Sequence, residues 1–439
     1  MELDGSTLHP IVGHALDASV AVPVEWSVVP ILAGDGQGLG VFRVSGSARV
    51  GGEPRAWSVI LKVLPAIPGS PTGWNYPARE ALAYERGLLD DLPPGLGAPR
   101  CFGHAEHGGQ HYLWLEDLGS DAIRWRLDDY GIAARALGRF NGAYLTGRSL
   151  PVAGWLSRQW LRSWLAEGAA AVRELPRFRR HRLVQRVYPR EVLDRLLLLW
   201  AHRQELLDAL DRLPQVLSHN DAFRRNLFLK SERLLAVDWA FLGPGPVGAE
   251  LAPLVTASVA FLGMARDRWR DLEQTAVEAY LRGLDDSGWR GAPDQPRFGF
   301  AASSALRYGP GCVRLVLPAL LDETAQPGVE LLLGIPFHQV LELWAAISSS
   351  RPDSPTTRSP SSPRSTYERA RDLLPRVEWS SSAVVCDDLG AVPQAYRRPG
   401  RLPAVRLSHL EADELPNSGD PQGIGSPAAG QGGRPAGGR

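Results

Sequence analysis

The sequence contains few cysteines and almost no lysine. Its three cysteines, Cys101, Cys312 and Cys386, are far apart and lack the close spacing of a zinc site or a disulfide framework. We therefore expect reduced thiols, and a bound metal ion would need oxygen ligands. Only Lys62 and Lys230 are lysines, and every other residue of the Lys and Arg class is arginine. Genome composition can produce this bias, so the scarcity of lysine assigns no role by itself.

The chain also lacks a net charge and a long apolar run. Its 48 Lys and Arg residues are balanced by 48 Asp and Glu residues, so no overall positive field favours nucleic acid or an anionic membrane. The apolar stretch 251–265 is short for a membrane span, and residues 1–13 have neither a basic leader nor an apolar signal segment. We expect a cytoplasmic protein with a small-molecule partner and with no nucleic-acid or membrane partner.

The pattern of the chain changes twice. Up to about Leu115, strand-like segments alternate with Gly-rich turns, and one helix is predicted at 76–92 with Pro77 in its first turn. The strands are expected at 26–32, 40–46, 57–64 and 111–115. From about 128 to 350, apolar residues recur at helical spacing. The last part is rich in Pro, Ser, Gly and Arg and cannot bury enough apolar surface, so we predict a disordered tail.

A polar segment interrupts the apolar strands within the helical region. It is LSHNDAFRRNLFL, and it continues into polar KSER and then into the strand-like LLAV. We predict a β-hairpin in which Leu229 pairs with Leu234. Counting outward from that pair puts Asn226 opposite Val237 and therefore next to Asp238.

Oxygen-bearing side chains meet at the open end of this hairpin. The carboxylate of Asp238 and the amide oxygen of Asn226 suit Mg²⁺, which takes few protein ligands and leaves places for phosphate oxygens and water. Asp221 precedes the hairpin within reach of the same place, where it could orient or deprotonate a hydroxyl group. The alternative is a surface loop whose polar residues only cap turns. The full set together with the hairpin favours the site.

The spacing of these residues, H-x-D-x-x-x-x-N followed by an aspartate, is that of a kinase catalytic loop and its metal-binding aspartate. The next line is DWAFLGPGPVGAELAPL, and with it the chain resembles the aminoglycoside phosphotransferase family of small-molecule kinases. Trp239 stands where protein kinases have phenylalanine. The resemblance implies that Asp221 is the catalytic aspartate and that Asn226 and Asp238 bind Mg²⁺. It makes His219 a structural member of the loop.

The resemblance also implies a protein-kinase-like α+β fold of two lobes. The implied parts are a small β-rich N-lobe at 1–112, an interlobe connector at 113–119, a mainly helical C-lobe with the catalytic hairpin at 120–350, and the tail at 351–439 outside the family region. The overall order matches over about 30–350. The specific motifs are confined to about 218–254 and, more weakly, to Lys62 and Glu80.

The N-lobe is then expected to supply nucleotide contacts. GDGQGLG joins two strands with glycine at every second position, so the backbone N–H groups of Gly36, Gly38 and Gly40 can approach a triphosphate. It is not the G-x-G-x-x-G of protein kinases, and an ordinary Gly-rich hairpin is the alternative. In the connector, the resemblance makes the backbone of Glu116 and Leu118 a candidate for binding adenine. Ordinary linker charges are the alternative for Glu116 and Asp117.

Lys62 is expected on the same strand face as Ile60 and Leu64, where an unpaired ammonium group would be costly. An edge-strand lysine that reaches water is the alternative, and the resemblance favours contact with the α- and β-phosphates of ATP. Such a lysine needs a carboxylate from the following helix. The family-like text REALAY favours Glu80, whereas helical periodicity turns Glu85 inward. We predict Glu80.

The implied enzyme is a small-molecule kinase that moves the γ-phosphoryl group of ATP, with Mg²⁺, to a hydroxyl group of its substrate. Asp221 orients that hydroxyl, and Lys62 neutralises phosphate charge. The acceptor is open. Trp155, Trp160 and Trp164 have near-helical spacing and are either an aromatic wall for the acceptor or, more simply, core residues.

Two functions of other classes remain open. One is a nucleotide-binding pseudokinase or scaffold, against which the complete set of Lys62, Asp221, Asn226 and Asp238 argues. The other is a metal-dependent phosphoesterase, which leaves the lysine and the Gly-rich loop unexplained.

Overall fold

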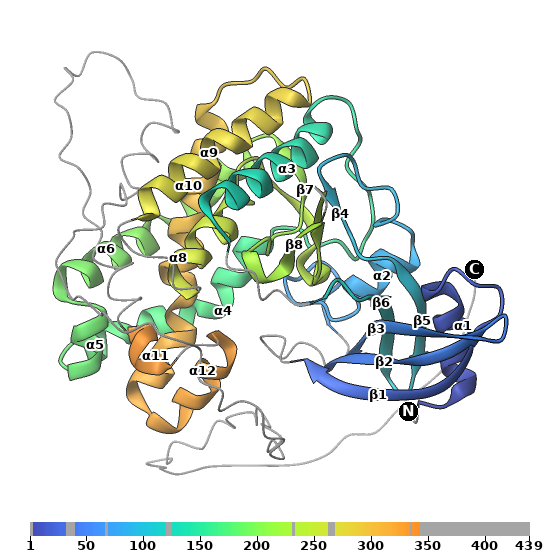
Figure 1. The fold of residues 1–439 in the computed structure, drawn as a ribbon. Helices are drawn as coiled ribbons and strands as arrows, with labels where there is room; N and C mark the ends of the chain where they lie inside the picture. Colours follow the sequence, from blue (N-terminus) through green and yellow to red (C-terminus); the bar gives the residue numbers. More distant parts are fainter. Residues whose placement is uncertain are drawn as a thin grey trace, which may run out of the picture. The chain divides into compact units, whose positions relative to one another are not determined.

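The computed structural model of the protein describes most of the two predicted lobes. The described residues are 3–31, 40–65, 69–119, 125–230, 233–261, 268–333 and 336–341. The predicted disordered tail lies outside them, as do Gly36 and Gly38 of the Gly-rich loop. Figure 1 shows the arrangement of the elements, which form an α+β fold.

The first lobe contains a five-stranded antiparallel sheet in the order β1-β2-β3-β6-β5. Its strands are β1 (Val22–Ile31), β2 (Gly40–Val50), β3 (Glu53–Pro65), β5 (Cys101–His107) and β6 (Gln110–Glu116). The four predicted strands correspond to β1, β2, β3 and β6. Strand β5 and helix α1 (Gly5–Ala15) were not predicted from the sequence, and Leu8 and Val12 of α1 pack in the core of this lobe.

Strand β3 separates two apolar cores. Every second residue of Trp57–Val63 packs in the core of the first lobe. The intervening Ile60 and Leu64 contribute to the main core, which extends through the helical lobe. Lys62 lies on the face of Ile60 and Leu64, as predicted, because side chains alternate between the two faces of a strand. Its ammonium group is therefore directed to the side of the sheet where the helical lobe begins.

Helix α2 (Arg79–Glu85) is shorter than the predicted helix at 76–92. It ends because Gly87 adopts the left-handed conformation, with a φ of 65°. The N–H of Gly87 donates to the carbonyl of Tyr84 at 2.9 Å, and the N–H of Leu88 donates to the carbonyl of Ala83 at 3.0 Å. This pair of bonds satisfies the last helical carbonyls, as in a Schellman cap. Pro77 precedes the helix instead of occupying its first turn.

The second lobe is mainly helical, as predicted. Its longer helices are α3 (Leu127–Leu145), α4 (Trp160–Glu174), α6 (Arg190–Ala201), α7 (Arg203–Asp211), α9 (Trp269–Asp286), α10 (Asp294–Tyr308), α11 (Val313–Leu321) and α12 (Gln326–Leu333). Helices α3 and α9 lie side by side (Figure 1), and the Cα atom of Gly283 lies 3.0 Å from the place where a Cβ of Gly138 would stand. Larger residues there would separate the helices. Among the described helices, none has the length and apolar character needed to span a membrane.

The predicted hairpin is present as β8 (Leu227–Lys230) and β9 (Arg233–Ala236), and its predicted register is confirmed. Leu229 pairs with Leu234, and beyond the ladder the N–H of Val237 donates to the carbonyl of Asn226 at 2.9 Å. Asn226 and Val237 are thus opposite each other, and Asp238 follows directly. The short strand β4 (Leu96–Gly97) joins β9 in parallel. A separate two-stranded pair, β7 (Gln215–Ser218) and β10 (Gly243–Pro246), flanks the polar loop.

Candidate active site

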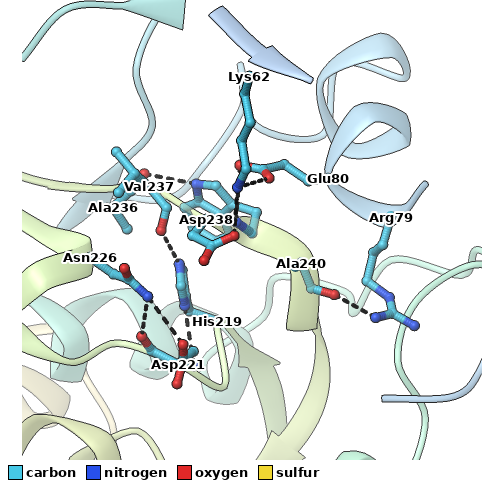
Figure 2. A network of polar contacts seen from close by, with 11 residues as sticks. Lys62, Arg79, Glu80, His219, Asp221, Asn226, Ala236, Val237, Asp238 and Ala240 are labelled. Carbon is cyan, nitrogen blue, oxygen red and sulfur yellow. Dashed lines mark hydrogen bonds and ion pairs between the residues drawn. The ribbon is translucent and has the colours of Figure 1, made fainter. Parts of the chain in front are cut away.

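Lys62 lies between two carboxylates from distant parts of the chain (Figure 2). Its Nζ atom is 2.5 Å from Glu80 Oε2 on α2 and 2.6 Å from Asp238 Oδ1, just after β9. Burial by itself lowers the pKa of the Lys62 ammonium, but the two carboxylates outweigh it and raise the pKa above its ordinary value. The lysine therefore stays charged. The same ammonium holds the pKa of Asp238 below its usual range against the opposing effect of burial.

Glu80, and not Glu85, contacts the lysine. Only 1% of the Glu80 side chain is exposed, and its second oxygen, Oε1, accepts from the N–H of Trp239 at 3.3 Å. Glu85 lies 3.9 Å from Arg86 and is 40% exposed. The periodicity that favoured Glu85 is misleading because helix α2 ends at that residue, so the stripe that continued to Leu89 is not helical.

His219 joins the polar loop to the segment of Asp238. Its Nδ1 accepts from the N–H of Asp221 at 3.2 Å, so the proton is on Nε2, which donates to the carbonyl of Val237 at 2.9 Å (Figure 2). Burial lowers the pKa of the ring to about 4, so the imidazole is neutral. Both nitrogens are thus used in fixing the backbone. This arrangement agrees with a structural place for His219 in the loop.

Asp221 is held by contacts to both of its carboxylate oxygens. Oδ2 accepts from Asn226 Nδ2 at 3.2 Å, and the same amide donates to the Asp221 carbonyl at 3.0 Å. Oδ1 forms an ion pair with Arg307 Nη2 on helix α10. Burial raises the pKa of Asp221, and Arg307 opposes that rise. Arg307 was not predicted from the sequence, where its local signal is a charged residue at a buried helical position between Leu306 and Tyr308.

Two residues of the loop region adopt backbone conformations that are rare outside glycine. Asn220 has a φ of 64° and Asp238 has a φ of 65°. Asn220 is fixed by its N–H, which donates to Glu250 Oε1 at 2.8 Å, and by its side-chain amide, which donates to the Phe241 carbonyl at 2.9 Å. Burial raises the pKa of Glu250 to about 7. Strained backbone that is held this firmly is typical of functional loops.

The oxygens of Asn226 and Asp238 fit a hard divalent cation. The Asn226 amide nitrogen and Asp238 Oδ1 have partners, and no recorded contact in the described part of the chain occupies Asn226 Oδ1 or Asp238 Oδ2. The two negative charges of Glu80 and Asp238 also exceed the single positive charge of Lys62. Within the described ranges no cluster of three or more His, Cys, Asp or Glu residues suits a metal ion. A site with two protein ligands is consistent with Mg²⁺, which keeps places for phosphate oxygens and water.

The predicted connector contains one charge with a structural task. Asp117 accepts from Arg43 Nε at 2.8 Å, from Ser58 Oγ at 2.5 Å and from the N–H of Gly119 at 2.9 Å, so it ties the connector to the sheet. The Glu116 side chain accepts from the backbone of Arg100. Leu118 is buried, and no backbone hydrogen bond is recorded for it among the described residues.

Gly40, the last of the three glycines predicted to contact phosphate, is the first residue of β2. The other two lie outside the described residues.

Arg79, next to Glu80, is fully buried and donates only to backbone carbonyls. Nε donates to Trp155, Nη1 to Trp74 and Ala240, and Nη2 to Pro71 and Gly73. Burial lowers the pKa of this guanidinium to about 10. The contact with Ala240 ties α2 to the segment that follows Asp238 (Figure 2). Arg79 therefore fixes the relative positions of Glu80 and Asp238, and the sequence analysis missed this role.

Replacing Arg79 with lysine is expected to lower the free energy of unfolding by about 3 kcal/mol or more. A lysine has three donors in a compact group and leaves at least two of the five carbonyls around Arg79 without a partner, at about 1–3 kcal/mol each. Chemical denaturation followed by circular dichroism measures the change. The control is Arg135→Lys, an exposed arginine paired with Asp286, for which we expect little change. Equal stability of the two variants would contradict this role.

The tryptophans of GWLSRQWLRSWL pack against the apolar cores, with Trp160 buried and Trp155 and Trp164 partly buried. Trp155 precedes helix α4, which begins at Trp160, so the three residues do not share one helical face. Trp160 and Trp164 stack with centroids 5.5 Å apart. Arg307 lies 4.5 Å over the Trp160 ring, and Arg314 lies 4.2 Å over the Trp164 ring. Trp160 and Trp164 thus make cation–π contacts with the protein's own guanidinium groups.

Comparisons with known proteins identify one matching family. The model of the phosphotransferase enzyme family matches residues 47–293, more than half of the 439-residue chain. No curated protein matches the chain.

Three similar solved structures illustrate the range of the matches. Amicoumacin kinase hAmiN, in complex with AMP-PNP and Ca²⁺, is 13% identical with a TM-score of 0.45, over 71% of this chain and 91% of that one. An aminoglycoside phosphotransferase from Streptomyces rimosus, in complex with ADP and streptomycin, is 19% identical with a TM-score of 0.38, over 64% and 92%. Choline kinase from Cryptosporidium parvum is 12% identical with a TM-score of 0.43, over 72% and 93%.

Proposed function

The chain belongs to the phosphotransferase enzyme family, and on this basis we propose that it transfers the γ-phosphoryl group of ATP to a hydroxyl group of a small molecule, with Mg²⁺ as the metal ion. One observation carries the proposal. Lys62 and Asp238, 176 residues apart in the chain, have their charged atoms 2.6 Å from each other. Phosphoryl transfer needs a cation for the phosphates and a carboxylate for the metal ion at one place, and this contact supports both assignments.

The proposed nucleotide site lies on the N-lobe side of this pair. Lys62 contacts the α- and β-phosphates, and Glu80 keeps its ammonium in place. The backbone of Gly36, Gly38 and Gly40 lies along the triphosphate, and the backbone of Glu116 and Leu118 binds adenine. The buried Leu118, with no recorded backbone partner in the described part of the chain, supports the last assignment.

Asn226 and Asp238 are the proposed magnesium ligands. Their unpartnered oxygens and the excess negative charge around Lys62 support this assignment. The bound ion would neutralise phosphate charge. The left-handed backbone of Asp238 and the contact of its Oδ1 with Lys62 fix the position of the side chain. Its other oxygen, Oδ2, is therefore in place before any ligand binds.

Asp221 is the proposed catalytic residue. Each of its oxygens accepts one protein hydrogen bond and has a further lone pair, and 15% of its side chain is exposed. A hydroxyl group of the acceptor can therefore donate to it. The carboxylate orients that hydroxyl and accepts its proton as the new P–O bond forms, and no covalent enzyme intermediate is needed. Among the described residues, the ion-pair partner of Asp221 is Arg307, and this positive neighbour does not favour a polycationic acceptor.

A transfer assay with γ-labelled ATP tests the proposal. Sugars, amino alcohols and nucleosides are first screened by thermal shift with a non-hydrolysable ATP analogue and Mg²⁺, and the best are then assayed for a labelled phosphoester. We expect transfer to at least one class, and its loss when EDTA removes the metal ion. Nucleotide binding without transfer would favour a pseudokinase. Hydrolysis of phosphoesters without ATP would favour a phosphoesterase, and either result would contradict the proposal.

A further inference from the structure

Arg307, near the end of helix α10, is fixed on every side although it lies far from the motif in the chain. Only 9% of the residue is exposed. Its Nη1 donates to the carbonyl of Asn220 at 2.5 Å, and its Nη2 donates to Asp221 Oδ1. The Arg307 Cζ atom lies over the Trp160 ring, 4.5 Å from its centroid, and 5.3 Å from the centroid of the Tyr308 ring. The two ring contacts and the two donor contacts together restrain the position of the guanidinium group.

The two anchors of Asp221 come from different elements. Arg307 holds Oδ1 from α10, and Asn226 holds Oδ2 from the turn before β8. Two contacts, one at each oxygen, restrict the rotation of the carboxylate about its last bond. The direction of its remaining lone pairs, and hence the place of an acceptor hydroxyl, is then set by the protein.

The charges around Asp221 give Arg307 an electrostatic role in addition to its structural one. The nearby carboxylates of Asp238 and Glu250 repel the negative charge of Asp221. Lys62 is paired with Glu80 and Asp238. Among the described residues, Arg307 is the cation in an ion pair with Asp221. A buried carboxylate without a partner is strongly unfavourable, and the ion pair with Arg307 provides that partner.

We propose that Arg307 is a positioning residue that fixes the orientation of the Asp221 carboxylate and supplies its counter-charge for phosphoryl transfer. The inference rests on the proposed function, in which Asp221 meets the acceptor hydroxyl. A lysine is a poor substitute, because it lacks the planar fork that reaches two separate oxygens while stacking on Trp160. The competing explanation is a purely structural arginine that only ties α10 to the loop.

A double-mutant cycle with Asp221→Asn separates the two explanations. We expect Arg307→Met to lower kcat by at least about tenfold with little change in the KM for ATP, since a misplaced catalytic group affects the transition state most. In the Asp221→Asn background, the same change is expected to lower the residual kcat by less than about twofold, because Arg307 acts through that carboxylate. A structural role predicts the same loss in both backgrounds. Thermal unfolding is measured for each variant.

Two further variants complete the experiment. Arg307→Lys keeps the positive charge, and it replaces Arg307→Met in the double-mutant cycle if the methionine variant does not fold. Arg314→Met is the matched control, because Arg314 also lies over a tryptophan ring but pairs with Glu167. We expect it to leave kcat unchanged both in the wild type and in the Asp221→Asn background. Wild-type kcat in both Arg307 variants, or equal losses in both backgrounds, would overturn this inference alone. A wild-type protein that transfers no phosphoryl group to any acceptor would remove the proposed function and this inference with it.

Discussion

Replacing Asp221 with asparagine is expected to lower kcat for phosphoryl transfer by about 10²–10⁴-fold, the usual contribution of a positioned general base. The affinity for ATP should stay near the wild-type value, because the proposed nucleotide contacts come from Lys62 and the N-lobe. Asparagine is preferred to alanine in this experiment. Its amide oxygen can still accept from Arg307, whereas alanine would leave that buried guanidinium without its partner.

Transfer of label from γ-labelled ATP measures kcat, and titration calorimetry with an ATP analogue measures the affinity. The control is Asp286→Asn, because Asp286 pairs with Arg135 and Arg139 and has no recorded contact with the polar loop in the described structure. Turnover by Asp221→Asn at the wild-type rate would reject the assignment of the catalytic residue. A parallel loss of ATP affinity would instead place Asp221 in the nucleotide site.

Local features of the site could be predicted from the sequence. The register that brings Asn226 beside Asp238 follows from a short hairpin, because one pair, Leu229 with Leu234, fixes all the others. The side of the sheet on which Lys62 lies follows from the alternation of side chains along a strand, which puts it with Ile60 and Leu64. Both predictions need only residues that are neighbours along the chain or across one turn.

Contacts between distant segments could not be predicted. Arg307 is 86 residues from Asp221, and Arg79 is 161 residues from Ala240, so no spacing rule connects either pair. The prediction of a helix at 76–92 was wrong because Gly87 ends the helix in a left-handed conformation, which apolar periodicity does not reveal. Strand β5, CFGHAEH, lacks the alternation of a half-buried strand, and it is held in the sheet by its pairing with β6.

Replacing Lys62 with methionine is expected to affect both stability and catalysis. The change leaves Glu80 as a carboxylate that is 1% exposed, beside Asp238 and without a cation, and breaking a buried pair in this way typically costs about 3–5 kcal/mol. Loss of the cation from the phosphate site is expected to lower kcat/KM for ATP by about 10²-fold or more. Chemical denaturation and steady-state kinetics measure the two effects. Lys230→Met is the control, because Lys230 is the other lysine of the chain and is exposed.

A second change separates the two effects of the Lys62 variant. Adding Glu80→Gln removes the uncompensated carboxylate, while the glutamine can still accept from the N–H of Trp239. We expect Lys62→Met with Glu80→Gln to recover most of the lost free energy of unfolding and none of the lost kcat/KM. Recovery of both would mean that the lysine serves only to neutralise Glu80. Recovery of stability alone assigns the ammonium to the phosphates of ATP, because the fold then no longer needs the lysine and the reaction still does.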